Sequence, residues 1–340
     1  MKYIIYPIII FSLILSAVYT FLFSNYANDI AKAVIAQKLQ RQIHHNVEVT
    51  QLLVHSLSDI DLICNIANEN TLKVHANIHY LSQKIDAKYH LNITNPQTFH
   101  IDAQPFYVKG DLNTTQAKLN IDGVSNIYNA TTNFYATLLE PSFKKFDLSK
   151  LNAKINSTIA KGELKANLAQ TNLTLSFNKL QAKEILKLTH YPQFMKGDLT
   201  GEATYSLLTQ KGNINANIEQ GYFVQNKIFN AVKLFGFVNL YKESFAGDVH
   251  ATINKNIANA NFKLHSKSAQ LTSKETQLDI FTQQIDSKMV VTVEGDPIQT
   301  HLYGNINKPL ISVNLEQFLN SKVAKKIQKE ALHFLDTLFK

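Results

Sequence analysis

Residues 84–93 read KIDAKYHLNI, and this stretch decides the fold class. Its apolar positions are Ile85, Ala87, Tyr89, Leu91 and Ile93. A charged or polar residue stands between each apolar residue and the next. Because successive side chains of a β-strand point to opposite faces, this alternation predicts a strand with one apolar and one solvated face. An apolar face must be covered by other protein or by a ligand.

The same alternation recurs from about residue 46 to residue 313, with Asn, Lys, Thr and His at the outward positions. One solvated face is typical of an antiparallel sheet. We therefore expect a mainly β protein whose mostly antiparallel sheet occupies residues 46–313. A sheet that folds onto itself as a sandwich or barrel would show the same alternation, so the pattern leaves open whether the apolar face is covered.

The composition of the chain excludes several classes of function. The chain has 340 residues, a net charge of +8 and one cysteine, Cys64. A single cysteine excludes an intrachain disulfide, a zinc knuckle and a CxxC redox motif. The positive charge comes mostly from lysines scattered through the strands, with Arg41 as the only arginine. Without a basic stripe or base-stacking motifs, we expect no nucleic-acid partner.

The N-terminal residues predict a membrane anchor. Residues 3–24 carry no charged side chain, and about 20 apolar residues span a bilayer. This run is longer than that of a cleaved signal peptide and lacks its small-residue exit. We expect residues 1–24 to form a single transmembrane helix that is not cleaved. Lys2 before the span favours a cytoplasmic N-terminus, which in a Gram-negative cell places the body in the periplasm.

Helical spacing interrupts the strand pattern in four places. A juxtamembrane helix is expected over 25–45, either lying on lipid headgroups or, as we favour, capping the sheet. Short helical segments are expected at 179–189 and 227–241, and the second of these could plug the apolar face. The last segment, 314–340, reads as a Lys-rich amphipathic helix. It either caps the last strand or contacts anionic lipid or a partner protein.

The sequence offers little for catalysis or metal binding. His75 and His79 share a strand face but would lie about 13 Å apart, too far to share an ion. Asp59 and Asp61 fit outward strand positions better than a catalytic carboxylate pair. Neither a Gly-rich phosphate loop nor a G-x-S-x-G elbow is present. We expect no metal, no cofactor, no catalytic residues and no enzymatic activity.

Two segments carry a resemblance to a known family. MKGDLTGEATYSL at 195–207 places Gly197, Leu199 and Gly201 in a Gly-x-Leu-x-Gly strand pattern. In LYGNINKPLISVNL, Gly304 and Pro309 precede a Lys-rich terminal helix. With the N-terminal anchor and the short helix behind it, this layout resembles AsmA-like proteins, a family of bacterial, inner-membrane-anchored, bridge-like lipid-transfer proteins.

The resemblance implies an elongated, curved β-sheet with an apolar groove. It also implies a role in phospholipid transfer to the outer membrane and in envelope integrity. The residues that would line the groove and bind lipid are Leu72, Val74, Ile78, Ile85, Ala87, Tyr89, Leu91, Ile93, Leu119, Ile121, Ile155, Leu164, Leu168, Leu173, Leu175, Phe177, Ile214, Ile218, Phe262 and Leu264. The alternative is a periplasmic scaffold or assembly factor for outer-membrane proteins. It would have no lipid conduit and would dock a partner through strand edges or the C-terminal helix.

Overall fold

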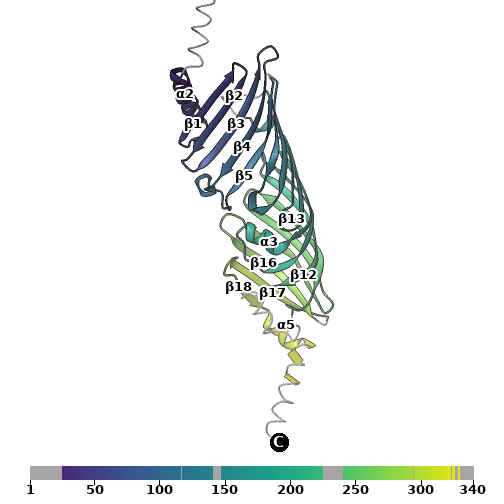
Figure 1. The fold of residues 1–340 in the computed structure, drawn as a ribbon. Coiled ribbons are helices and arrows are strands. Elements are labelled where there is room, and N and C mark those ends of the chain that lie inside the picture. Colours follow the sequence, from purple (N-terminus) through teal and green to yellow (C-terminus); the bar gives the residue numbers. More distant parts are fainter. Residues whose placement is uncertain are drawn as a thin grey trace, which may run out of the picture. The chain divides into compact units, whose positions relative to one another are not determined.

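The computed structural model describes residues 25–115, 117–140, 147–224, 240–293, 295–322, 324–325 and 328–329. Within these residues the protein is mainly β, with 18 strands in an open antiparallel sheet and few helices (Figure 1). The prediction of a mainly β, antiparallel protein is confirmed. The chain divides into two compact units, residues 1–152 and residues 153–340, and each is described by itself.

The described part of unit 1 begins with a helix and continues as a run of strands joined by turns and short 3-10 helices. Its elements are α2 (Asn25–Ile43), β1 (Val47–Ser56), β2 (Asp59–Ile66), β3 (Asn70–His79), β4 (Lys84–Ile93), η1 (Pro96–Phe99), β5 (Phe106–Thr114), β6 (Lys118–Ser125), η2 (Ile127–Asn129), β7 (Thr132–Leu139) and η3 (Leu148–Lys150). Strand β8 (Leu151–Ser157) spans the division between the units.

The described residues of unit 2 form ten further strands and two short helices. Its elements are β9 (Glu163–Ala169), β10 (Asn172–Gln181), α3 (Ala182–Leu188), β11 (Met195–Ser206), β12 (Lys211–Phe223), β13 (Phe245–Asn254), β14 (Ile257–His265), β15 (Ala269–Asp279), β16 (Gln284–Val293), β17 (Asp296–Asn305), β18 (Leu310–Val313) and α5 (Leu315–Asn320).

Each unit is a meander, in which every strand pairs antiparallel with the next from β1 to β7 and from β9 to β18. Within each unit, turns that follow odd-numbered strands therefore lie at the same end of the strands. We name this end the tight-turn edge, because the turns that join paired strands there are short. Turns that follow even-numbered strands share the opposite edge. We name it the loop edge, because the long connection 94–105, helix α3 and the described residues 240–244 before β13 lie there.

Each unit has its own hydrophobic core. In unit 1, helix α2 packs Ala31, Ile35 and Leu39 against a buried cluster formed by β1 and β2 that includes Leu52 and Cys64. Asn28 fixes the helix to the sheet by donating a hydrogen bond to the carbonyl oxygen of Leu52 at 2.9 Å. The core of unit 2 is centred on strands β11–β16. In unit 1, the contacts of helix α2 show that it covers the first strands of the sheet, as the capping interpretation expects.

The helical segment predicted at 179–189 is shorter in the structure. Strand β10 continues through Leu180, which pairs with Leu199, and through Gln181, which pairs with Asp198, so that α3 begins only at Ala182. The spacing at 179–181 resembles that of a helix because the strand is irregular there. A register shift between Phe177 and Leu180 places these two apolar residues three positions apart, which breaks the alternation within β10.

Three other predicted segments lie wholly or partly outside the described residues. These are the anchor over 1–24, most of the segment over 227–241 and the distal part of the helix over 314–340. Leu240 and Tyr241, at the end of the second segment, form a turn, and the described start of the terminal helix is α5. Among the described residues, no helix has the length and apolar character needed to cross a bilayer.

Candidate functional site

The candidate site is the apolar face of the sheet, and strand register defines it. Residues directly opposite each other on neighbouring strands place their side chains on the same face. In unit 1, register partners form a continuous cross-strand row of Leu52, Leu62, Val74, Tyr89, Gly110, Gly123 and Phe134. A second row contains Val54, Ile60, Ala76, Ala87, Leu112, Ile121 and Ala136. Neither row contains a charged residue.

Unit 2 repeats this arrangement on its own strands. One row consists of Leu164, Phe177, Gly201, Ala216, Val249, Phe262, Ser273, Met289, Thr300 and Val313. The next row consists of Ala166, Leu175, Ala203, Ile214, Ala251, Ala260, Thr276, Ser287, Leu302 and Ile311. Both rows extend across all ten strands of the unit.

The structure places the predicted lining residues on these faces. All ten in unit 1, from Leu72 to Ile121, lie on the apolar face of that unit, as their register partners show. In unit 2, the nine from Leu164 to Leu264 lie on the apolar face of that unit. Ile155 differs, because it lies in β8, whose strand partners are not among the described pairs, and its side chain is exposed.

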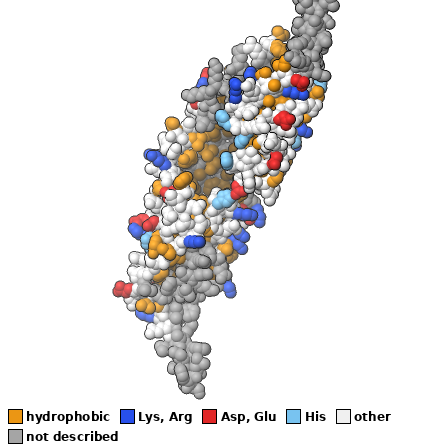
Figure 2. Space-filling model, turned by 90° about the vertical axis from the view of Figure 1, so that its left-hand side faces the viewer, with side chains coloured by type: hydrophobic (Ala, Val, Ile, Leu, Met, Phe, Trp, Pro, Cys, Tyr) orange, Lys and Arg blue, Asp and Glu red, His pale blue; other side chains and the backbone are white. Residues whose placement is uncertain are grey.

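Burial changes along each strand. In unit 1 the fully buried residues gather at the loop edge, where they include Val47, Ile66, Asn70, Ile93 and Phe106. Further along the strands, toward the tight-turn edge, most apolar side chains are half-buried, Ala87 is buried and Ile85 is exposed. Strands β10–β16 of unit 2 show the same gradient. On the side shown in Figure 2, hydrophobic side chains gather in a hollow with histidines at its margin.

A pair of glycines shapes the apolar face of unit 1. Gly110 and Gly123 lie opposite each other, and a Cβ on Gly123 would come within 2.8 Å of the Tyr89 hydroxyl and 2.9 Å of the Phe134 ring. The Tyr89 hydroxyl donates a hydrogen bond to the carbonyl oxygen of Asp122 at 3.2 Å. Burial, with the charges of nearby aspartates, raises the pKa of Tyr89 to about 12. The glycines thus let an aromatic ring lie along the face with its polar end satisfied.

Hydroxyl groups that were not predicted from the sequence interrupt the apolar face in strands β15–β17. Ser273, Thr276, Ser287 and Thr300 all stand at apolar-face positions, and three of these four residues are buried. Their hydroxyls bond to one another at 2.9 Å and 2.5 Å and to the carbonyl oxygens of Lys288 and Met289. The signal in the sequence was a Ser or Thr where the alternation calls for an apolar residue.

The opposite face is polar and carries ion pairs. Asp61 accepts hydrogen bonds from His55 and His75, both at 2.7 Å, and all three side chains are exposed. The hydrogen bond to Asp61 raises the pKa of His55, and the hydrogen bonds from the two histidines lower the pKa of Asp61. In the described part of the chain, no group of three or more histidine, cysteine or acidic side chains is arranged to hold a metal ion.

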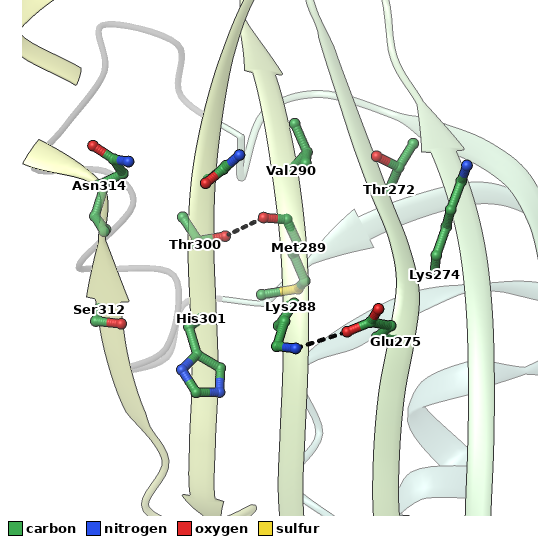
Figure 3. A pocket seen from close by; sticks show the side chains of 12 residues that line it. Thr272, Lys274, Glu275, Lys288, Met289, Val290, Thr300, His301, Ser312 and Asn314 are labelled. Atoms are coloured by element: carbon green, nitrogen blue, oxygen red, sulfur yellow. Dashed lines mark hydrogen bonds and ion pairs between the residues drawn. The ribbon is translucent and has the colours of Figure 1, made fainter. Parts of the chain in front are cut away.

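An open trough of about 650 Å³ lies along β15–β18 and is drawn in Figure 3. Polar-face residues supply most of its lining, and Met289, Thr300 and Val313 of the apolar rows complete it. The Lys288 ammonium lies 2.8 Å from Glu275, which raises the pKa of the lysine, and His301 lies 3.0 Å from Asp286. Ser312 is the register partner of His301, but among the described contacts no hydrogen bond joins their side chains. This arrangement suits solvated ion pairs.

Compared with known proteins, the chain matches no protein-family model, no curated protein and no solved structure.

Proposed function

We propose that this protein binds lipid and transfers it, holding acyl chains against the apolar face. In this proposal the N-terminal segment 3–24 fixes the chain in the inner membrane. The body lies in the periplasm and supplies lipid to the outer membrane. The observation that carries the proposal is that the apolar rows of unit 2 run without a polar residue from β9 to β14, while their large side chains remain partly exposed. The resemblance to AsmA-like proteins supports the same function.

Half-exposure is the informative part of this observation. Leu173, Leu175 and Phe177 all face the same side of the sheet, and each keeps part of its surface open to solvent. Burying a large apolar side chain fully stabilises a protein by roughly 1.5–3 kcal/mol. A face that forgoes part of this stabilisation at position after position is consistent with a surface that an apolar ligand covers.

The energetics of an acyl chain fit such a face. Each CH₂ group costs about 0.8 kcal/mol in water, so a 16-carbon chain resists crossing an aqueous gap by roughly 12 kcal/mol. The strands from β9 to β14, at a spacing of about 4.8 Å, extend roughly 25 Å in the hydrogen-bonding direction. The rows of unit 2 present mainly Leu, Ile, Val, Ala and Phe over this extent. Such side chains suit sliding contact with a chain of repeating CH₂ groups, and the proposal requires no catalytic step.

Photo-crosslinking in cells tests the proposal with the full chain. A benzoylphenylalanine replaces Leu175 on the apolar face or, as the matched control, its exposed neighbour Thr174 on the polar face. Leu91 and His90 make the same pair in unit 1. We expect mass spectrometry to find phospholipid adducts at positions 175 and 91 and none at positions 174 and 90. Absence of lipid at all four positions, or equal labelling of both faces, would contradict the proposal.

A further inference from the structure

One turn sequence occurs three times on the tight-turn edges. It reads YLSQ at 80–83 between β3 and β4, LLTQ at 207–210 between β11 and β12, and IFTQ at 280–283 between β15 and β16. Each consists of two apolar residues, a hydroxyl residue and a glutamine. The glutamine has a left-handed backbone each time, with φ of 50° at Gln83, 55° at Gln210 and 56° at Gln283. The three turns therefore share a conformation as well as a sequence pattern.

The second apolar residue of each turn projects into solvent. The exposed fraction is 106% for Leu81, 79% for Leu208 and 87% for Phe281. Hairpin turns are normally built from Gly, Asn, Asp, Ser and Pro, because these residues adopt the backbone angles of a turn or hydrogen-bond to its backbone. A single exposed leucine needs no explanation. A large apolar side chain at the same position of three matching turns does.

The tips of unit 2 are held in fixed positions. Backbone hydrogen bonds join each turn of the edge to the next, from Leu207 to Thr171 at 2.8 Å and from Lys255 to Gln210 at 2.7 Å. Two more join Ile280 to Asn256 at 2.8 Å and Ile306 to Gln283 at 2.9 Å. The Asp279 carboxylate also accepts hydrogen bonds from the backbone N–H groups of Phe281 and Thr282. A rigid tip loses little conformational entropy when it meets a partner.

Spacing and charge indicate what kind of partner fits. Four strands separate the tips at Leu208 and Phe281, so the two tips lie roughly 19 Å apart. The turn between them carries the exposed, charged Lys255, and Lys211 and Lys308 are exposed along the same edge. A protein interface normally requires a contiguous desolvated centre. A bilayer interface accommodates separate Leu and Phe side chains, and lysines are attracted to anionic headgroups.

We propose that the tight-turn edge of unit 2 docks on the surface of an anionic bilayer, with Leu208 and Phe281 inserted among the lipid headgroups. This inference goes beyond the proposed function, because it assigns a membrane contact to the turns and does not require lipid on the apolar face. If the protein both binds lipid and docks in this way, the bilayer meets the edge that lies nearest the partly exposed region of the apolar face. Unit 1 has the same kind of turn, with the exposed Leu81 at its tip.

The test uses the full chain in vesicles, with an environment-sensitive fluorophore on a cysteine introduced at position 208 or 281. The matched controls are labelled at the exposed polar-face positions Glu202 and Gln277 on the same hairpins, and the native Cys64 is fully buried. In vesicles containing phosphatidylglycerol, we expect the 208 and 281 probes to shift to the blue and to be quenched by headgroup-depth spin labels, while the controls remain in water. In pure phosphatidylcholine, we expect the quenching to fall several-fold.

A variant with a polar residue at one tip tests whether the two tips bind the bilayer together. Replacing Leu208 by Ser should reduce quenching of the 281 probe by about tenfold or more, because one buried apolar side chain is removed from the contact. If the tip probes are no more quenched than the controls, the proposal is wrong. If their shielding follows the protein-to-lipid ratio without lipid quenching, a second copy covers the tips, which also overturns it. Lipid crosslinking at positions 175 and 91 does not depend on the turns. It therefore tests the proposed function independently of either outcome.

Discussion

The two ends of the apolar face of unit 2 make an instructive comparison. Leu271 and Leu175 are the same residue type on the same face, yet Leu271 near the loop edge is 3% exposed whereas Leu175 is half-exposed. Phe245 and Phe177 differ in the same way. Near the loop edge the face is an ordinary core, and nearer the tight-turn edge it is a surface. One alternating pattern therefore serves both stability and, in our proposal, ligand contact.

The difference arises from what covers each end. Phe194, Leu240 and Tyr241, from connections at the loop edge, pack on the buried cluster of unit 2. Glu243 fastens this cover, because it accepts hydrogen bonds from the hydroxyls of Ser266 and Ser268 in the turn between β14 and β15. Burial opposes ionisation of Glu243, but these hydrogen bonds outweigh it and lower the pKa of the carboxyl group. The tight-turn edge has only short turns, which cannot reach back over the face.

Introducing a carboxylate at each leucine should give the largest difference between the two ends. We expect Leu271→Glu to destabilise the protein by about 3–5 kcal/mol or to prevent folding, because the charge would be buried without a partner. Leu175→Glu should cost only about 1 kcal/mol, because its carboxylate can reach water. Urea unfolding of the full chain in mild detergent measures both. Equal losses would mean that the two ends do not differ in cover.

Truncating the two phenylalanines should give a smaller contrast in the same direction. Phe245→Ala removes a side chain that is 0% exposed and should cost about 3–5 kcal/mol, because a cavity remains. Phe177→Ala should cost roughly 1 kcal/mol, because the ring is already partly in water. Thermal unfolding followed by circular dichroism provides the comparison. A larger loss for Phe177 than for Phe245 would reverse our assignment of core and surface.

Tyr89 should show the smallest effect and reports how dry the middle of the face is in unit 1. Its folded pKa of about 12 lies above the ordinary value of 10.0, because burial favours the neutral phenol. Its contribution to stability is therefore complete below pH 10 and is lost as the pH rises toward 12. The stability of the wild type should fall relative to Tyr89→Phe over this interval, measured by urea unfolding at each pH. A constant difference would show that the phenol is solvated.

The alternation of apolar and polar residues was sufficient to predict most strands and to predict which face each side chain occupies. Stretches such as KIDAKYHLNI have a period of two, and 19 of the 20 predicted lining residues lie on the apolar face of their own unit. The hydroxyls of Ser273 and Ser287 on that face were missed, because a small polar residue at one position looks like noise in an alternating pattern. The helix predicted from residue 179 began later, because a register shift kept Leu180 in the sheet.

The sequence by itself determined that the chain forms strands with one apolar face, because side-chain direction alternates in any extended backbone. Only the tertiary structure decided which part of that face is covered. Cover comes from segments outside the strands themselves, such as Leu240 packing over the core of unit 2 and α2 packing over β1. The tips at Leu208 and Phe281 likewise gained meaning only when hydrogen bonds between successive turns placed them along one edge. Local pattern fixes where a side chain points, and long-range packing fixes what it meets.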